Sequence, residues 1–192
     1  MPRIEPFLSI RRARTTDRAA VIDIYNHYVR ASPATFEVEP VRVEDRAMWF
    51  DEHAGEGRYR LLVVELPDAG VVGWATSSQF RPRAAYDTTV ETSVYCRHGF
   101  EGRGLGPALY SELFRALESL DIERFVAGIT LPNIASVRLH ARFGFQPVGT
   151  FHRVGRKFGQ YWDVEWFERP AHAAPVSGQL ATADRISNEQ RA

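Results

Sequence analysis

Three glycines at alternating positions in the middle of the chain restrict its fold more than any other feature. Gly102, Gly104 and Gly106 occur in the stretch EGRGLG, and a long run of helix-forming residues begins there. Glycine tolerates positive φ and lets another group approach the backbone closely. The N–H groups and the dipole at a helix N-terminus attract anions. The stretch predicts a phosphate-binding loop, completed by Leu105 and by the charge of Arg103; a glycine turn without a ligand is the alternative.

Two common phosphate-binding motifs do not fit this loop. A P-loop requires a Lys-Ser or Lys-Thr pair after its glycines, and neither pair follows Gly106. The dinucleotide fingerprint requires the spacing G-x-G-x-x-G at the first turn of a βαβ unit. Here the spacing is G-x-G-x-G, and it occurs in the middle of the chain. The remaining interpretation is a pyrophosphate cradle formed by the loop and the first turn of the next helix.

Hydrophobic periodicity and turn residues predict a mixed sheet with helices on its faces. The expected strands are residues 8–13, 59–66, 70–80, 88–96 and 123–131, and then two strands within residues 145–168 around a turn at 155–160. The expected helices are residues 17–32, 41–54, 106–120 and 133–143, with Thr16 as the N-cap of the first and Gly144 as the C-terminal cap of the last. Because strands and helices do not alternate regularly, the expected class is α+β.

Length and composition exclude several classes of protein. The 192 residues suffice for one domain, expected at residues 8–169, and the Ala-, Ser- and Pro-rich residues 170–192 are expected to form a flexible tail. The formal net charge is zero, so neither nucleic acid nor an anionic membrane is an expected partner. Without a long apolar run or a signal peptide, a cytoplasmic location is expected. The single cysteine, Cys96, excludes an internal disulfide, and the histidines lack metal-ligand spacing, so no metal is expected.

The glycine loop resembles the coenzyme A signature of the GNAT superfamily of N-acetyltransferases. That signature is Gln/Arg-x-x-Gly-x-Gly/Ala directly after a strand, and EGRGLG supplies Gly104 and Gly106 at the matching positions. Glu101 stands where the signature has Gln or Arg, and a carboxylate there repels a pyrophosphate. Arg103 is therefore expected to carry more of the compensating charge.

A second motif, LPNIASVRLHARFGF, matches the same family at Asn133, at Ser136 and at the Gly-Phe pair after the helix. His140 stands where many members have tyrosine. Together with the stretches IYNHYVRASPATFEVEP and RPRAAYDTTVETSVY, this motif is similar to the phosphinothricin N-acetyltransferase branch. In that branch histidine is usual at this position, and a glutamate occurs at the position of Glu91. The resemblance covers residues 10–168.

Membership of this branch implies a fold, a cofactor and a reaction. The fold would be an α/β/α sandwich with a mixed, mostly antiparallel sheet and helices on both faces. Acetyl-CoA would be the co-substrate, and transfer would be direct, within a ternary complex, to the amino group of a small amino acid such as phosphinothricin or methionine sulfoximine. The resemblance also implies a homodimer and a role in detoxification, including herbicide resistance.

Two residues are candidates for the catalytic proton transfers. Glu91 lies inside an expected strand, where a carboxylate without a partner is costly. It is either the general base that takes a proton from the amine or an acid paired with a structural Arg or Tyr. His140 lies one helical turn after Ser136, so both can face one cleft. Its imidazole could activate the amine or protonate the departing thiolate; a structural core histidine is the alternative.

The resemblance assigns further residues to the cofactor. The backbone of Val94, Tyr95 and Cys96 would bind the pantetheine arm and polarise the thioester carbonyl, which makes the Cys96 side chain a small hydrophobe and not a nucleophile. Asn133, followed by Ser136, would bond the pantetheine or cap the next helix.

The acceptor would be bound by cations and aromatic rings, because an amino acid with a second acidic group suits arginine forks. The residues that match the branch are Phe36, Arg81, Arg83 and Tyr86; solvated surface arginines are the alternative.

Two rival functions keep the same fold. In the first, the acceptor is a different small amine or amino acid, because pockets built from loops change their selectivity readily. In the second, the chain is a non-catalytic acyl-CoA-binding or interaction domain. The presence of Glu91, His140 and Asn133 together favours an enzyme over this second rival.

Overall fold

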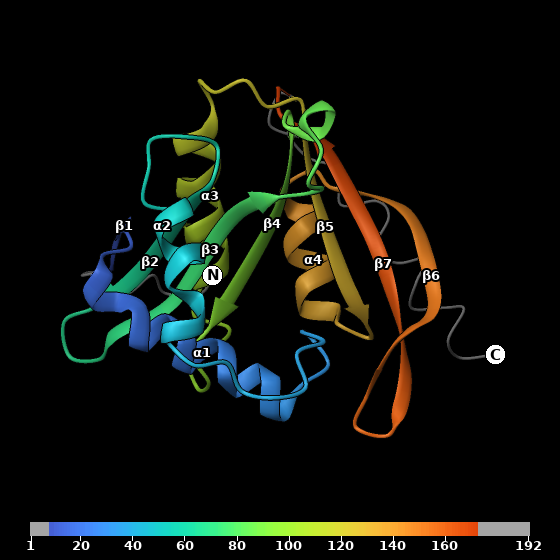
Figure 1. Cartoon of the computed structure of the whole chain (residues 1–192), viewed down its shortest axis with the longest axis horizontal. Coiled ribbons are helices and arrows are strands. Elements are labelled where there is room, and N and C mark those ends of the chain that lie inside the picture. The colour runs from blue at the N-terminus through green and yellow to red at the C-terminus, as the bar shows by residue number, and fades with distance from the viewer. Residues whose placement is uncertain (1–7, 173–192) are drawn as a thin grey trace.

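In the computed structural model, which describes residues 8–172, one seven-stranded sheet runs through the molecule in the order β1-β2-β3-β4-β5-β7-β6 (Figure 1). Neighbouring strands are antiparallel except β4 and β5, which are parallel. The strands are β1 Ser9–Arg12, β2 Arg60–Leu66, β3 Gly70–Gln79, β4 Thr89–Cys96, β5 Arg124–Leu131, β6 Gln146–Lys157 and β7 Gln160–Pro170. The helices are α1 Arg18–Ala31, α2 Ala47–Glu52, α3 Leu105–Leu117 and α4 Ile134–Arg142, with 3-10 turns at Thr15–Asp17, Glu44–Arg46 and Ala84–Tyr86.

Helices cover both faces of the sheet. In Figure 1, α1 and α2 lie in front of it and α3 and α4 lie behind. The larger core is behind the sheet, where Leu109, Tyr110 and Leu113 of α3 are fully buried. A smaller core in front packs Trp74 of β3 against α1 and against Phe50 of α2. The α/β/α sandwich that the resemblance implied is therefore confirmed. Within residues 8–172, no helix is long and apolar enough to cross a bilayer.

The expected N-cap of the first helix, Thr16, is wrong. Thr15–Asp17 form a 3-10 turn, and α1 begins directly after Asp17. The Asp17 carboxylate accepts a hydrogen bond from the Arg14 N–H at 2.7 Å and pairs with the Arg11 guanidinium at 2.6 Å. These bonds anchor the turn to β1, so the Asp17 carboxylate directly before the helix, and not the Thr16 hydroxyl, organises this end.

The helix expected at residues 41–54 is shorter than predicted, since only a 3-10 turn and α2 form there. Asn26 of α1 holds the backbone of Val41 with both atoms of its amide: Nδ2 donates to the Val41 carbonyl at 2.8 Å, and Oδ1 accepts from the Val41 N–H at 2.9 Å. Because these backbone groups bond to a neighbouring helix, the segment before Glu44 stays non-helical.

The turn of the last hairpin is also narrower than the expected residues 155–160. β6 and β7 extend until only Phe158 and Gly159 separate them, and both of these residues have positive φ, 53° and 78°, as in tight two-residue turns. β7 continues to Pro170, after which the Ala171 N–H donates to the Glu123 carbonyl at 3.0 Å. From residue 173 on, the expected tail lies outside the described residues.

The parallel pair β4–β5 is the feature that positions the site. The two strands pair at only three positions, Thr89–Glu91 with Arg124–Val126. Beyond Glu91 they diverge (Figure 1), while β4 continues to pair with β3 and β5 with β7. Along residues 92–96, β4 therefore has no strand partner on its β5 side within the described chain. A free backbone edge of this kind can bind an extended ligand.

Candidate active site

The divergence of β4 from β5 opens a cavity of about 470 Å³. Its walls are the two strands, the loop before α3, and α4. It brings together most residues that sequence analysis assigned to the cofactor, and also one of the two catalytic candidates: Val94, Tyr95, Cys96, Gly102, Gly104, Leu105, Gly106, Asn133, Ser136 and His140.

The glycine loop has the shape of an anion cradle. Gly102 and Gly104 have φ values of 75° and 84°, a left-handed conformation that L side chains rarely adopt. A Cβ atom on Gly106 would lie 3.2 Å from Cδ2 of Leu139, so glycine lets α3 approach α4 closely. The first N–H groups of α3 have no partner within the helix, and Gly104 and Gly106 at its start line the cavity. A pyrophosphate fits this cradle.

The charged residues of the loop are oriented in a way that the sequence did not indicate. Glu101 accepts a hydrogen bond from the Gly99 N–H at 2.7 Å, and its other carboxylate oxygen lies 3.5 Å from His98 Nδ1. The Arg103 guanidinium donates to the Gly99 carbonyl at 3.2 Å and lies 4.7 Å from the centre of the Phe100 ring. Glu101 thus stabilises the loop itself, and Arg103 is not among the described residues that line the cavity.

α4 supplies the opposite wall of the cavity. Oδ1 of Asn133 accepts a hydrogen bond from the Ser136 N–H at 3.1 Å, so Asn133 caps the helix, which is one of its two predicted roles. Arg138 and Arg142 also line the cavity. Residues four apart lie on one side of a helix. Sequence analysis missed both arginines, although their spacing after the Asn133 motif could have indicated a basic helix face beside the loop.

His140 lines the same cavity but is only 3% exposed. Its Nδ1 lies 2.8 Å from the Ser136 carbonyl oxygen, which can only accept, so Nδ1 carries the proton. Nε2 is then an acceptor, and it receives a hydrogen bond from the Tyr110 hydroxyl at 2.9 Å. Burial lowers the pKa of His140 below its ordinary value. The ring is therefore neutral at pH 7, with both nitrogens engaged.

Glu91 points to the other face of the sheet. Side chains alternate along a strand, and Thr92, its neighbour on β4, lies 3.5 Å from the Tyr110 hydroxyl behind the sheet. Glu91 and Ser93 therefore point to the front, beside α1 and α2. Burial raises the pKa of Glu91, and the nearby charge of Arg81 partly opposes that rise. The two catalytic candidates thus belong to opposite faces of the sheet, and of the two only His140 lines the larger cavity, together with Ser136 as expected.

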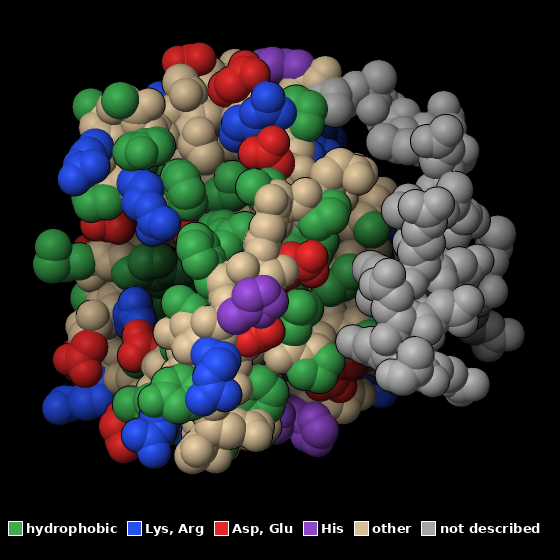
Figure 2. All heavy atoms as spheres, turned by 90° about the vertical axis from the view of Figure 1, so that its right-hand side faces the viewer, with side chains coloured by type: hydrophobic (Ala, Val, Ile, Leu, Met, Phe, Trp, Pro, Cys, Tyr) green, Lys and Arg blue, Asp and Glu red, His purple; other side chains and the backbone are tan. Residues whose placement is uncertain are grey.

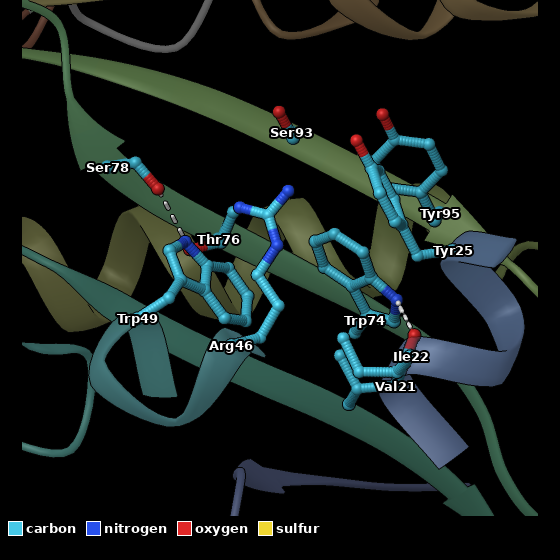
Figure 3. Close-up of a pocket in the computed structure, with 10 residues that line it drawn as sticks. All are labelled: Val21, Ile22, Tyr25, Arg46, Trp49, Trp74, Thr76, Ser78, Ser93 and Tyr95. Carbon is cyan, nitrogen blue, oxygen red and sulfur yellow. Dashed lines mark hydrogen bonds between the residues drawn. The ribbon is translucent and has the colours of Figure 1, made fainter. Parts of the chain in front are cut away.

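A second cavity, of about 160 Å³, lies in front of the sheet between α1, α2, β3 and β4 (Figure 3). Arg46, from the 3-10 turn before α2, extends its guanidinium between the rings of Trp49 and Trp74 in this view. Its Nη2 also donates to Glu37 at 2.6 Å. The hydroxyl groups of Thr76, Ser78 and Ser93 and the rings of Tyr25 and Tyr95 also line this cavity. We call this space the aromatic pocket.

The two cavities share part of their walls. Ser93 and Tyr95 of β4 line both of them. A molecule in the aromatic pocket would therefore lie directly beside the larger cavity. Sequence analysis did not single out Arg46, because within the stretch VRVEDRAMWF an arginine among acidic residues looks like any solvated helix face.

None of the four predicted acceptor residues lines the aromatic pocket. Arg81, Arg83 and Tyr86 are exposed, in the segment between β3 and β4. The Arg81 guanidinium lies 4.6 Å from the centre of the Phe80 ring, and the Tyr86 ring centre is 5.8 Å from the same ring. The positive charge of Arg81 acts to lower the pKa of Glu91, so this segment influences the front of the site.

Phe36 belongs to the loop between α1 and α2, which is fastened to the last hairpin. Its ring packs on Gly155 of β6, where an added Cβ would collide with it. The buried Lys157 donates from Nζ to the carbonyl oxygens of Ser32 and Thr35, at 2.8 and 2.7 Å. The β6–β7 hairpin therefore fixes the loop that carries Phe36.

Cys96 lies at the end of β4, in the wall of the larger cavity. Burial raises the pKa of its thiol to about 11. The thiol is protonated at neutral pH and is a poor nucleophile. Among residues 8–172, no group of three or more His, Cys, Asp or Glu side chains is placed to hold a metal ion.

Comparison with known proteins agrees with this geometry. A sequence model described as the acetyltransferase (GNAT) domain matches residues 10–166. The phosphinothricin N-acetyltransferase of Streptomyces coelicolor is 50% identical over 164 residues, which are 85% of this chain and 96% of that protein. The L-methionine sulfoximine/L-methionine sulfone acetyltransferase of Pseudomonas aeruginosa is 35% identical over 170 residues, 87% of this chain and 98% of that protein.

A solved structure has the same fold and holds the expected co-substrate. It is a GNAT superfamily phosphinothricin acetyltransferase from Sinorhizobium meliloti in complex with acetyl-CoA, with a TM-score of 0.81 and 29% identity, and the match covers 92% of this chain and 97% of that one. The glycine cradle, the diverging strands and these comparisons lead to one conclusion. The chain belongs to the GNAT family and is an acetyl-CoA-dependent N-acetyltransferase.

Proposed function

We propose that this enzyme acetylates the amino group of a small, glutamate-like amino acid such as phosphinothricin or methionine sulfoximine. The observation that carries the proposal is that Ser93 and Tyr95 line both the aromatic pocket and the cofactor cavity. An acceptor in the pocket therefore lies beside the donor. Relatives named after these two acceptors are 50% and 35% identical to the chain, which supports the acceptor class.

The acceptor's acidic groups are assigned to arginines. Arg46 reaches into the aromatic pocket, and a guanidinium binds a carboxylate or a phosphinate through two parallel hydrogen bonds. Arg81, Arg83 and Tyr86 contribute from the segment between β3 and β4, and Phe36 contributes from the loop held by the last hairpin. The pocket's volume of about 160 Å³ suits one small amino acid and not a peptide or a nucleotide.

The proton transfers divide between the two faces of β4. Acetyl-CoA supplies the acetyl group as a reactive thioester, and the free backbone edge at Val94, Tyr95 and Cys96 orients its pantetheine arm. Glu91 is the general base in front of the sheet, because burial raises its pKa toward the range in which a carboxylate takes a proton efficiently. Behind the sheet, His140 lines the cofactor cavity, donates its Nδ1 proton in a hydrogen bond to the Ser136 carbonyl and accepts a hydrogen bond from the Tyr110 hydroxyl at Nε2. In this proposal His140 gives the Nδ1 proton to the departing thiolate and regains the proton that the acetylated nitrogen loses.

The test is thiol release from acetyl-CoA with a panel of acceptors: phosphinothricin, methionine sulfoximine, methionine sulfone, ordinary amino acids and simple polyamines. Turnover restricted to the first three compounds supports the proposed acceptor class. Turnover only with other amines leaves the acetyltransferase and overturns the acceptor. Binding of acetyl-CoA without turnover of any compound favours a non-catalytic role.

We also propose that the enzyme is a homodimer, joined through the β6–β7 hairpin. Figure 2 views the molecule from this side, where apolar side chains are exposed between charged ones. Five large apolar residues of the hairpin are at least half exposed: Val148, Phe151, Val154, Phe158 and Tyr161. Apolar patches of this kind mark contact surfaces. Light scattering after size exclusion should give twice the chain's mass of 21.8 kDa, and a Phe151→Asp variant should give the mass of one chain.

Because acetyl-CoA is an intracellular metabolite, we assign the enzyme to the cytoplasm.

A further inference from the structure

The cofactor cavity contains two positive charges that no other part of the site accounts for. Arg138 and Arg142 of α4 both line it, and both are exposed to the space inside. Among the described residues, neither guanidinium forms an ion pair or a side-chain hydrogen bond. On α3, by contrast, Arg115 pairs with Glu112 at 2.6 Å. Two arginines left without a carboxylate partner, on one side of a short helix, are suited to an anion from outside the chain.

The charge balance of the cavity supports the same conclusion. Glu101 brings a carboxylate to its rim, and such a charge weakens the binding of an anionic cofactor. Arg103, the cation that the sequence offered as compensation, is directed to the Gly99 carbonyl and the Phe100 ring instead. Arg138 and Arg142 are then the arginines that line the cavity, on the helix that packs on Gly106 through Leu139.

Coenzyme A carries two separate phosphate groups, a pyrophosphate and a 3′-phosphomonoester on its ribose. The glycine loop offers backbone N–H groups, which suit the pyrophosphate. The phosphomonoester is close to doubly charged at neutral pH and presents three strong acceptor oxygens, which guanidinium forks match well. The cavity therefore has one binding element for each of the two groups.

We propose that Arg138 and Arg142 bind the 3′-phosphate of coenzyme A and make the enzyme selective for it over 3′-dephospho-coenzyme A. The inference concerns only the co-substrate and does not depend on which acceptor is acetylated. Its test therefore needs no acceptor and can be made by calorimetric titration of the full chain with coenzyme A and with 3′-dephospho-coenzyme A.

The variant for this test is the double substitution Arg138→Gln and Arg142→Gln. We expect its Kd for coenzyme A to rise about tenfold, which corresponds to roughly 1.4 kcal/mol, and its Kd for dephospho-coenzyme A to change less than twofold. The wild-type preference for coenzyme A should also weaken as the salt concentration rises, because exposed charges are screened. If the double variant folds poorly, the single variant Arg138→Gln can replace it, and the logarithm of its change in Kd for coenzyme A should be about half as large.

The matched control is Arg30→Gln. Arg30 is exposed in the last turn of α1, as Arg142 is in the last turn of α4, and it does not line the cavity. It removes a charge at the same kind of helix position, so both Kd values should stay at their wild-type levels. An equal loss of affinity for the two ligands in the double variant, or wild-type protein that binds them equally well, would overturn the proposal.

Discussion

The two sides of the active site are built in different ways. Most of the cofactor side comes from one continuous part of the chain, residues 92–142, which contains the end of β4, the glycine loop, α3, β5 and α4. The acceptor side is assembled from the start of the chain, the segment between β3 and β4, and the last hairpin, which meet only in the folded protein. A site that is local in sequence leaves a motif that can be recognised, whereas a site formed by distant loops leaves isolated residues. Four experiments test this contrast.

The largest effect is expected from Glu91→Gln, which removes the proposed base but keeps the shape of the side chain. General-base catalysis contributes about 10²–10⁴-fold to a rate, so kcat should fall by at least about 10²-fold. The Kd for acetyl-CoA should stay the same, because Glu91 lies on the face of β4 away from the helices that hold the cofactor. A loss of cofactor affinity equal to the loss in kcat would mean that Glu91 acts on both sides of the site.

The pH profile sharpens this first experiment. Burial raises the pKa of Glu91 above the ordinary carboxyl value of 4.5. The base works only when ionised, so kcat in the wild type should fall as the pH drops through this raised pKa, at a pH above 4.5. The small remaining activity of Glu91→Gln should lack that acidic limb. Persistence of the limb in the variant would assign it to another group.

The second effect concerns the cofactor side and is expected from Gly104→Glu. The new side chain would carry a negative charge at the N-cap of α3. Residue 104 has a φ of 84°, which L side chains rarely adopt, so the glutamate would also strain the backbone. The KM for acetyl-CoA should rise by more than about tenfold through repulsion of the pyrophosphate, with a smaller change in the acceptor KM.

Gly159→Glu is the matched control for that variant. Gly159 has a φ of 78° and, like Gly104, has no atom near the position of a Cβ, but it lies in the hairpin turn away from the cofactor. Both variants carry the same strain and the same charge. If both raised the KM for acetyl-CoA equally, the effect would come from general strain and the loop assignment would be lost.

The cofactor side also contains the motifs from which the family was predicted, a prediction that the comparisons confirmed. The glycine spacing, the helix that follows and the Asn133 motif depend on local backbone geometry, so they could be recognised without the fold. What the sequence could not indicate was the direction of charged side chains. The sequence predicted that Glu101 repels the pyrophosphate and that Arg103 compensates, yet each side chain bonds to Gly99 within the loop. Such choices are decided by a few competing hydrogen bonds of similar strength.

On the acceptor side, most of the information lies in contacts between distant residues. The predicted Thr16 cap was wrong because Arg11 and Arg14 bind the Asp17 carboxylate, which organises the start of α1. The predicted helix at residues 41–54 was too long because Asn26 of α1 holds the backbone of Val41. Arg46 was missed for the same reason, since only the fold directs it between Trp49 and Trp74. Helix propensity and periodicity do not contain such contacts.

The third experiment is therefore Arg46→Gln, aimed at the residue that sequence analysis missed. Loss of one guanidinium fork in a partly buried site should raise the acceptor KM by about tenfold, without changing the KM for acetyl-CoA. Arg42→Gln is the control, because Arg42 lies in the same segment and pairs with Glu44 at the surface, outside the pocket. If the acceptor KM stayed unchanged in Arg46→Gln, Arg81 and Arg83 would be the arginines that bind the acceptor, and Arg46 would not.

The smallest effect is a change in stability, and it decides between a catalytic and a structural Glu91. A carboxyl whose pKa is raised by folding contributes stability that is fully present below the unfolded pKa of 4.5 and is lost as the pH rises through the folded pKa. At pH 8 the ionised Glu91 therefore destabilises the fold, on the order of 1 kcal/mol for each pKa unit.

Glu91→Gln should accordingly raise Tm at pH 8, and this gain should shrink toward zero near pH 4.5. Comparison of the variant with the wild type at each pH cancels the opposite contribution of His140, whose lowered pKa destabilises the fold as the pH falls below 6.5. A structural glutamate paired with an arginine would give the reverse result, a variant less stable at pH 8. A residue that costs stability at the pH where the enzyme works is retained for the reaction and not for the fold.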